Sequence, residues 1–200
     1  MRVSSYRCIA MDPPWYEHGG IKKGAQRHYK ILKLPQIIET VLGSQYWRPD
    51  GSGCHLWCWY TDNHLRDALG LIDALGFRYI RTLIWIKAAP CRVQLDAELS
   101  CGVEGWRTQG FGIGQYLRGQ HEGCILAVRG AAHRMVRNRD VGSVVVAPRG
   151  RHSQKPQAAY DAIERVSPGP RLEMFARALR DGWDTWGDEA PEAKETGEAG

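Results

Sequence analysis

The stretch "CHLWCWYTDNHLRDALGLIDALGFRYIRTLIWIK" at residues 54–87 decides the fold class. Residues 54–60 are rich in aromatic and aliphatic side chains, which is typical of a buried strand. Residues 61–76 predict a helix, because Leu65, Leu69 and Ile72 share one helical face. Thr61 or Asp62 can cap the start of this helix, and Gly76 can end it. Residues 78–87 are β-rich again, so the stretch has the strand–helix–strand order of an α/β domain.

The same alternation extends to both sides of this stretch. Helices are predicted with Pro35 and Pro156 in their first turns, where proline costs no hydrogen bond. We therefore expect an α/β domain over residues 1–187, with a mostly parallel sheet and helices on both of its faces. The further predicted strands are residues 6–11, 122–130, 143–147, 171–176 and 183–186, and the further helices are residues 34–42 and 155–166.

Composition and charge narrow the class of protein. The chain has 200 residues, 43% of them hydrophobic, which suits one globular domain. Residues 188–200 hold five acidic side chains and one lysine, so they predict a disordered tail, and residues 1–187 carry +9 against +5 for the whole chain. This basic body fits a nucleic-acid partner or simply a solvated basic surface. With neither a signal-peptide pattern nor an apolar run of about 20 residues, we expect a cytoplasmic protein without membrane contact.

The cysteines and histidines do not form a metal-binding pattern. No Cys-x-x-Cys pair and no histidine pair at zinc-finger spacing occurs among the six cysteines and seven histidines, so we expect no metal. Four cysteines fall inside apolar stretches that read as strands. We expect these to be buried free thiols, namely Cys8, Cys54, Cys58 and Cys124.

The motif "DPPW" at residues 12–15 directly follows the first predicted strand. Ligands of parallel α/β sheets bind beyond the carboxyl ends of the strands. Proline has no N–H, so we expect the carbonyls of Pro13 and Pro14 to face a ligand without an internal donor competing for them. The Asp12 carboxylate adds an acceptor, and Trp15 or Tyr16 can stack on a planar group. These groups suit the exocyclic amine of adenine or cytosine, whereas the tetrapeptide alone also fits a plain strand-ending turn.

Two acceptors on such an amine would promote its attack on an electrophilic methyl group. The nitrogen lone pair is delocalised into the ring, and acceptors for both of its protons favour a more pyramidal, electron-rich nitrogen. The acceptors would also stabilise the positive charge that develops on the nitrogen during transfer.

Five stretches of the chain recur together, in the same order, in one known family. They are "MDPPW" (11–15), "HLWCWYTDNHL" (55–65), "LIWIK" (83–87), "GFGIGQYLRGQHEGCILAVRG" (110–130) and "RHSQKPQAAYDAIERVSPGPRLEMFARALRDGWDTWGDE" (151–189). The chain resembles the DPPW-type adenine methyltransferases of the MT-A70 family over most of residues 6–189. The resemblance implies a Rossmann-like class I methyltransferase fold that uses S-adenosyl-L-methionine, in a permuted order with the DPPW motif before the cofactor strand.

The resemblance implies methylation of the 6-amino group of adenine in DNA. The same transfer to adenosine in RNA is the first alternative, and an inactive nucleic-acid-binding partner subunit is the second. Such a subunit is expected to lose the acid of the motif, which this chain keeps as Asp12. A homodimer is left open. No separate target-recognition domain is evident, so specificity would come from loops or from a second subunit, or it would be low.

The resemblance also assigns residues to the site. Asp12, Pro13, Pro14 and Trp15 would be catalytic, and Trp59 would line the pocket, with one of Trp57 and Trp59 facing the core. Lys155, which opens a predicted helix, would lie near the methionine end of the cofactor. The other cofactor residues would be Glu173, Met174, Phe175 and Arg177 on the cofactor strand and its turn, and Asp188 and Glu189 near the ribose and adenine. Many relatives have an Asn–Gln-like pair in place of Asp188 and Glu189, and the turn "FARALRDGW" lacks the histidine or asparagine of some relatives.

Two basic segments, residues 22–30 and 129–140, are expected to be loops near the mouth of the crevice. They are either phosphate contacts or flexible surface. Residues 110–114, "GFGIG", are not followed by a helix in the G-x-G-x-x-G form and are expected to be a turn. The expected nucleic-acid contacts are Lys22, Lys23, Arg27, Arg137 and Arg139 for phosphates, and Tyr16 and Tyr29 for bases.

Overall fold

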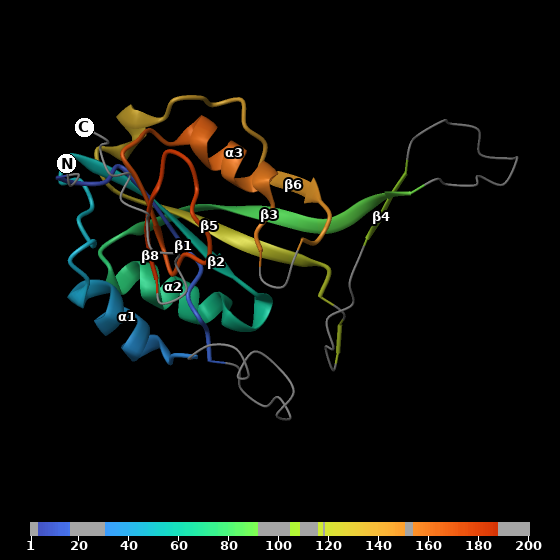
Figure 1. The fold of residues 1–200 in the computed structure, drawn as a ribbon, viewed down its shortest axis with the longest axis horizontal. Coiled ribbons are helices and arrows are strands. Elements are labelled where there is room, and N and C mark those ends of the chain that lie inside the picture. The colour runs from blue at the N-terminus through green and yellow to red at the C-terminus, as the bar shows by residue number, and fades with distance from the viewer. Residues whose placement is uncertain are drawn as a thin grey trace, which may run out of the picture.

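The computed structural model describes residues 4–16, 31–91, 105–108, 116–117, 119–150 and 154–187, which form one sheet with helices on both faces (Figure 1). The strands lie in the order β4-β3-β5-β2-β1-β7-β8, and β6 pairs with β3. The strands are β1 (Cys8–Met11), β2 (Gly53–Tyr60), β3 (Arg78–Cys91), β4 (Gly105–Thr108), β5 (His121–Gly130), β6 (Val144–Ala147), β7 (Arg171–Met174) and β8 (Asp184–Trp186). The helices are α1 (Leu34–Gly43), α2 (Leu65–Ala74) and α3 (Gln157–Val166), with short 3-10 helices η2 (Asp62–His64) and η3 (Ala132–Met135).

The strand directions confirm the expected fold class. The pairings of β1 with β2 and β7, of β7 with β8, and of β3 with β6 are parallel. Among the strands that the structure describes, β4 and β5 run against the others. This mostly parallel sheet, with the strand of the DPPW motif before β7 in the chain, has the expected Rossmann-like architecture in the permuted order.

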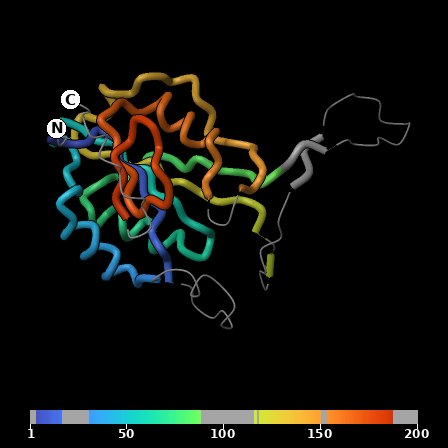
Figure 2. Tube along the Cα trace, in the orientation of Figure 1, coloured from blue at the N-terminus to red at the C-terminus, as the bar shows by residue number. Residues whose placement is uncertain are grey.

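A switch in strand order lies between β1 and β7. Met11, the last residue of β1, is the register partner of Cys58 in β2 and of Met174 in β7. From β1 the chain continues through α1 to β2 on one side, whereas β7 leads to β8 on the other side. In Figure 2 the red C-terminal segment accordingly runs beside the blue β1. Open α/β sheets bind ligands at such a switch, outside the carboxyl ends of the strands.

Side chains that alternate along the central strands build a core on each face of the sheet. In β1, Ile9 and Met11 join the core under α1 and α2, whereas Cys8 and Ala10 join the core under α3. Figure 1 shows α1 and α2 on one side of the sheet and α3 on the other. The expected free thiols are confirmed as buried, namely Cys8, Cys54, Cys58 and Cys124.

Helix α2 presents a different face from the one expected. It buries Ala68, Leu71 and Ile72, whereas Leu65 is 41% exposed. The reason is that η2 occupies residues 62–64, so Leu65 begins the α-helix at the edge of the core instead of within its apolar stripe. Thr61 precedes η2 without a side-chain capping bond, and Gly76 ends the segment with a φ of 76°, as expected for glycine.

Two boundaries also differ from the expected ones. Helix α3 begins at Gln157 with Pro156 as its N-cap, so Lys155 lies before the helix and does not open it. Strand β3 continues to Cys91, where it pairs with β4 and extends away from the body of the domain (Figure 1). The sequence did not predict β4, because the proline at position 90 argues against a continuing strand. None of the helices in the described ranges is long and apolar enough to cross a membrane.

Candidate active site

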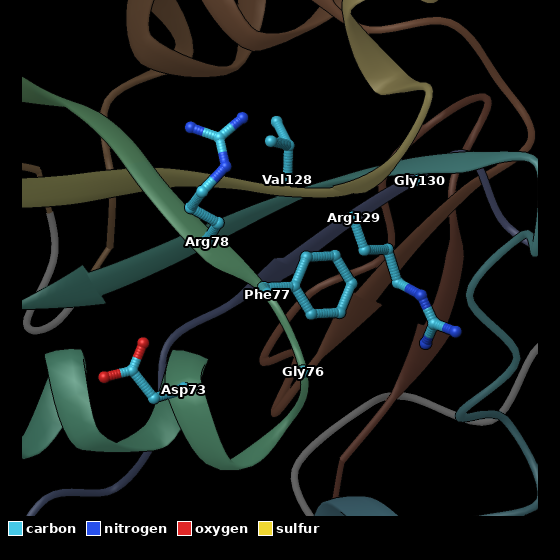
Figure 3. Close-up of a pocket in the computed structure, with 7 residues that line it drawn as sticks. All are labelled: Asp73, Gly76, Phe77, Arg78, Val128, Arg129 and Gly130. Atoms are coloured by element: carbon cyan, nitrogen blue, oxygen red, sulfur yellow. The ribbon is translucent and has the colours of Figure 1, made fainter.

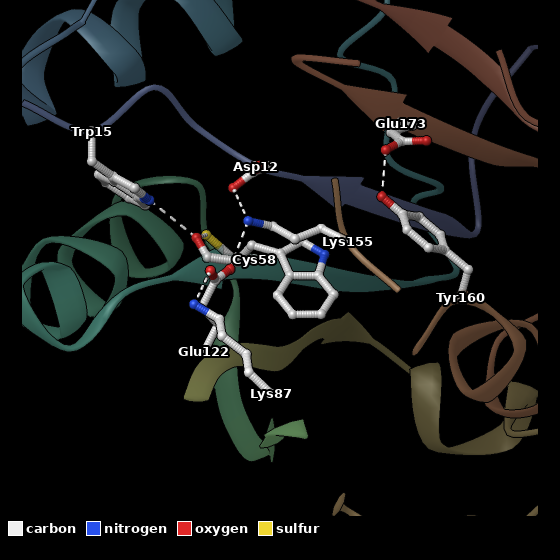
Figure 4. A network of polar contacts seen from close by, with 9 residues as sticks. Asp12, Trp15, Cys58, Lys87, Glu122, Lys155, Tyr160 and Glu173 are labelled. Atoms are coloured by element: carbon white, nitrogen blue, oxygen red, sulfur yellow. Dashed lines mark hydrogen bonds and ion pairs between the residues drawn. The ribbon is translucent and has the colours of Figure 1, made fainter. Parts of the chain in front are cut away.

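Asp12 lies at the carboxyl end of β1, beside the switch in strand order. Its Oδ1 is 3.1 Å from Nζ of Lys155, which reaches the same edge from the segment before α3 (Figure 4). The Lys155 side chain is 9% exposed and the Asp12 side chain 19%. The predicted catalytic acid and the predicted cofactor lysine therefore form a largely buried ion pair, although 143 positions separate them in the chain.

Two further charged residues continue this ion pair across the sheet. Lys155 Nζ is 2.8 Å from Glu122 Oε2 at the start of β5, and Lys87 Nζ in β3 is 2.7 Å from Glu122 Oε1. The four groups alternate in sign, and their formal charges cancel. We call Asp12, Lys155, Glu122 and Lys87 the ion network.

The network keeps its buried members charged. Burial on its own lowers the pKa of Lys155, but the carboxylates of Asp12 and Glu122 outweigh burial and raise that pKa above its ordinary value. Burial likewise raises the pKa of Glu122, but the charges and hydrogen bonds of Lys155 and Lys87 hold it below its ordinary value. Lys155 and Glu122 are therefore ionised at neutral pH.

The proline carbonyls of the DPPW loop do have internal donors, so the expectation that none competes for them is wrong. Pro13 O accepts a hydrogen bond from the Trp15 N–H at 2.9 Å, and Pro14 O accepts one from the Leu32 N–H at 2.8 Å. The Tyr16 N–H donates to Leu32 O at 3.1 Å, which ties the loop to the segment before α1. A carbonyl oxygen can accept two hydrogen bonds, so Pro13 O retains one acceptor site.

The indole of Trp15 is held on two sides. Its Nε1 donates to Trp59 O at 3.1 Å, and its ring stacks on the ring of His64, with centroids 5.7 Å apart and planes 12° from parallel. His64 is buried, and no hydrogen-bond partner of its ring nitrogens lies in the described part of the chain. Its Nδ1 is 3.5 Å from Asp67 Oδ2, which is longer than a normal hydrogen bond. His64 therefore acts mainly as a flat plate behind Trp15.

Replacing His64 by alanine should lower the free energy of unfolding by about 2–3 kcal/mol, because it removes a buried ring and the stacking partner of Trp15. His64→Phe keeps a flat ring and removes two buried nitrogens without partners, so its stability should equal or exceed that of the wild type. Urea unfolding of the three proteins measures both effects. Equal destabilisation by alanine and phenylalanine would contradict the plate role.

Trp57 and Trp59 both face the core under α3, so the expectation that they face opposite ways is wrong. Residues two apart in a strand lie on the same face of the sheet. Trp59 is fully buried, with its ring 5.3 Å below the ammonium of Lys155 and edge-on to Trp85 at 6.5 Å. Its Nε1 finds no acceptor among the residues that the structure describes. Trp59 thus forms the floor beneath Lys155.

The turn after β7 has a constrained backbone at the same edge of the sheet. Phe175 has a φ of 59°, in the left-handed region that non-glycine residues seldom adopt. At Gly187 a Cβ would lie 2.7 Å from Ala176 N, so only glycine permits this close approach. Backbone strain of this kind concentrates at functional sites.

The predicted cofactor residues of β7 and its turn are placed differently from one another. Glu173 accepts a short hydrogen bond from Tyr160 OH and lies 3.4 Å from Arg180 Nε, so its carboxylate is held against α3. Burial raises the pKa of Glu173, and Tyr160 and Arg180 offset only part of that rise. Met174 is fully buried in the core under α1 and α2, whereas Arg177 is half-buried just beyond the strained turn.

Arg137 and Arg139 lie at the opposite edge of the sheet, so the expectation that their segment borders the crevice is wrong. Strand β5 runs antiparallel to β2, which puts Gly130 beside Gly53 at the start of β2. The Arg137 N–H donates to Val166 O at the far end of α3. The physical reason is the direction of β5, which carries the chain away from Asp12. Lys22, Lys23, Arg27, Tyr29, Asp188, Glu189 and residues 110–114 lie outside the described residues.

A pocket of about 380 Å³ opens at that same far edge (Figure 3). Asp73, Phe77, Arg78 and Arg129 line it, and the Arg129 guanidinium lies 5.7 Å over the Phe77 ring. This pocket does not include any member of the ion network. The described ranges also contain no group of three His, Cys, Asp or Glu side chains that could hold a metal ion. We therefore place the candidate chemistry at the ion network.

Sequence reasoning missed Glu122 and Lys87. Both lie in stretches that carry the family resemblance, and each is a charged residue at the end of an apolar run, which is a usable signal. Their meeting depends on the antiparallel pairing of β3 with β5, in which Trp85 opposes Glu122 and Ile86 opposes His121. That pairing could not be predicted from either stretch alone.

Comparison with known proteins agrees with this geometry. The family model MT-A70 matches residues 6–189. The chain is 26% identical over 209 residues to the type II methyltransferase M.MunI of Mycoplasma sp, covering 94% of this chain and 79% of that protein. It is also 26% identical over 192 residues to the human N(6)-adenosine-methyltransferase catalytic subunit METTL3 and to a putative MT-A70-like protein of Medicago truncatula, but spans only 28% and 27% of their lengths. The chain belongs to the MT-A70 family of methyltransferases.

Proposed function

We propose that this protein transfers a methyl group from S-adenosyl-L-methionine to the 6-amino group of adenine in DNA. The observation that carries the proposal is the Asp12 carboxylate at the carboxyl end of β1, paired with the buried Lys155. Family membership supports methyl transfer, and the relative M.MunI, of which this chain covers 79%, supports DNA as the substrate. The same transfer to RNA is the second candidate, favoured by the likeness to METTL3.

The residues at this edge fit the cofactor. A buried ammonium at Lys155 suits the carboxylate of its methionine part, and the strained turn at Phe175 lies where β7 ends beside β1. Glu173, Phe175 and Arg177 are the proposed cofactor residues of β7 and its turn, with Asp188 and Glu189 near the ribose and adenine. Met174 would act only through its backbone because its side chain is in the core. When bound, the cofactor supplies an electrophilic methyl group on a positively charged sulfur.

The amine of adenine would be held by two acceptors. One oxygen of Asp12 and the remaining acceptor site of Pro13 O would each take one amine N–H, and the rigid prolines fix their directions. These bonds turn the nitrogen lone pair toward the methyl group and stabilise the positive charge that develops on the nitrogen. The extra proton can leave after the transfer, so no strong base is required. Trp15 and Tyr16 would flank the base, whereas Trp59, which is fully buried beneath Lys155, would support the pocket from below.

An adenine in a duplex must leave the stack to reach Asp12, which costs a few kcal/mol. A chain of this size has few elements with which to open a duplex, so single-stranded or mismatched DNA should be methylated at least as fast as matched duplex. The basic segment that follows the DPPW motif supplies the proposed contacts with the strand, namely Lys22, Lys23, Arg27 and Tyr29. Binding should weaken as salt rises.

Radiolabelled methyl transfer tests the proposal directly. Matched duplex, mismatched duplex, single-stranded DNA and RNA of one sequence are compared, and the products are digested to nucleosides and identified. The expected product is 6-methyladenine in DNA. Transfer confined to RNA would favour the second candidate, a strong preference for matched duplex would contradict the strand-opening argument, and nucleic-acid binding without any transfer would indicate an inactive partner subunit.

A further inference from the structure

We propose that Glu122, anchored by Lys87, is a positioning residue that draws the Lys155 ammonium away from Asp12 and so leaves Asp12 able to accept the substrate amine. The inference rests on the proposed methyl transfer to adenine. Neither Glu122 nor Lys87 belongs to the DPPW motif or to the strand and turn proposed to hold the cofactor. Their role is read from the ion network alone (Figure 4).

The contact distances show that Lys155 is shared unequally. Its Nζ is 2.8 Å from Glu122 Oε2 but 3.1 Å from Asp12 Oδ1, so the ammonium leans toward Glu122. Charge-assisted hydrogen bonds are strongest near 2.7–2.9 Å. The contact with Lys155 is made by Oδ1 of Asp12, one of its two carboxylate oxygens. In this arrangement the ion pair occupies Asp12 only in part.

Glu122 is fixed by bonds to both of its oxygens. Lys87 Nζ holds Oε1 at 2.7 Å while Lys155 holds Oε2, and both Glu122 and Lys87 are nearly buried, with side chains 14% and 12% exposed. The ammonium of Lys87 also lies 5.4 Å over the Trp85 ring, and this contact helps to hold the Lys87 side chain in place. Glu122 therefore cannot swing toward Lys155 or away from it without breaking a buried bond.

The loss of the Glu122 charge would affect the amine site in two ways. Within the ion network Lys155 would keep only Asp12 as a charged partner and would move closer to it, which weakens Asp12 as an acceptor for the amine. The formal charge of the network would rise from zero to +1, close to a nitrogen that becomes positive during methyl transfer. Both effects oppose the transition state and have little effect on a ground state in which the amine is neutral.

Glu122→Gln keeps the side-chain shape and removes the charge. We expect kcat for methyl transfer to fall about tenfold or more, while KM for DNA changes less than about threefold. Affinity for S-adenosylhomocysteine, measured by calorimetry, should also change less than about threefold, because its sulfur carries no positive charge for the altered network to repel. Glu164→Gln is the matched control. Glu164 lies on α3, outside the ion network, and its carboxylate accepts a hydrogen bond from Trp183 Nε1. That control should keep the wild-type kcat.

Lys87→Gln provides an independent variant in case Glu122→Gln does not fold. It releases the anchor but leaves Glu122 charged, so Glu122 no longer holds Lys155 in a fixed place and kcat should fall several-fold at an unchanged KM. The loss should be smaller than in Glu122→Gln, because the formal charge of the network falls to −1 instead of rising to +1. The double variant should lose no more than Glu122→Gln alone, because both changes break one connected unit. Wild-type kcat in either folded single variant would overturn the inference, as would a raised KM for DNA at an unchanged kcat, which would make Glu122 a substrate contact. Absence of cofactor binding and transfer in the wild type would instead contradict the proposed function itself.

Discussion

Replacing Asp12 by alanine should abolish detectable methyl transfer in a protein that still folds, with kcat reduced by about 10²–10³-fold or more. Asp12 is proposed to supply one of the two acceptors for the amine, and an acceptor that acts on developing charge contributes mainly to the transition state. The fold should survive because Lys155 keeps Glu122 as a partner at 2.8 Å. Radiolabelled transfer to single-stranded DNA measures kcat, and urea unfolding checks the fold.

Asp161→Ala is a suitable control for this variant. Asp161 is an exposed carboxylate on α3 that accepts a hydrogen bond from Gln157 Nε2, and it lies outside the ion network. The control should keep both wild-type turnover and wild-type stability. Near-normal turnover of a folded Asp12→Ala protein would refute the proposed role of the carboxylate, whatever the behaviour of the control.

Replacing Lys155 by methionine should have the largest effect on stability, about 3–5 kcal/mol lost from the free energy of unfolding. The substitution fills a similar volume but removes the cation between Asp12 and Glu122, which leaves nearly buried carboxylates facing each other. The same variant should bind S-adenosylmethionine too weakly for calorimetry to detect. The wild type should bind it in the absence of nucleic acid. Urea unfolding gives the stability change from the shift of the transition midpoint.

The pH dependence of this stability difference follows from the direction of the pKa shifts. The pKa of Glu122 is lowered in the folded protein, so its pairing with Lys155 stabilises above the ordinary value of 4.5 and is lost as pH falls through the lower, folded value. The pKa of Lys155 is raised, so its pairing is lost only as pH rises above 10.5 and through the raised value. The difference between wild type and Lys155→Met should therefore be greatest at intermediate pH and shrink in acid.

Arg165→Met removes an ion pair of a different kind and serves as the control. Arg165 pairs with Asp140 at 2.8 Å, but both side chains are more than half exposed. Exposed pairs of this kind contribute about 0–1 kcal/mol. If Lys155→Met and Arg165→Met each lowered the free energy of unfolding by only about 0–1 kcal/mol, the result would contradict the view that the ion network is a buried, mutually dependent unit.

The order of elements and the family could be predicted from the sequence alone. Apolar runs such as residues 54–60 and 122–130 became strands, and the helices α1, α2 and α3 formed close to their expected places, because residues near in the chain set these periodicities. The position of DPPW after the first strand followed for the same reason. The combination of motifs from residue 11 to residue 189 also indicated the MT-A70 family, which the family model confirms.

Which of these residues lie in contact depends on the three-dimensional fold. Asp12, Glu122 and Lys155 belong to separate stretches, and the sheet order brings them together because β1, β2 and β5 are neighbours with β5 reversed. The same reversal moves Arg137 and Arg139 to the far edge. Hydrogen bonds from Trp15 and Leu32 to the proline carbonyls were equally invisible in the sequence. Local patterns specify how a segment folds, whereas charge pairing and strand direction depend on contacts between segments far apart in the chain.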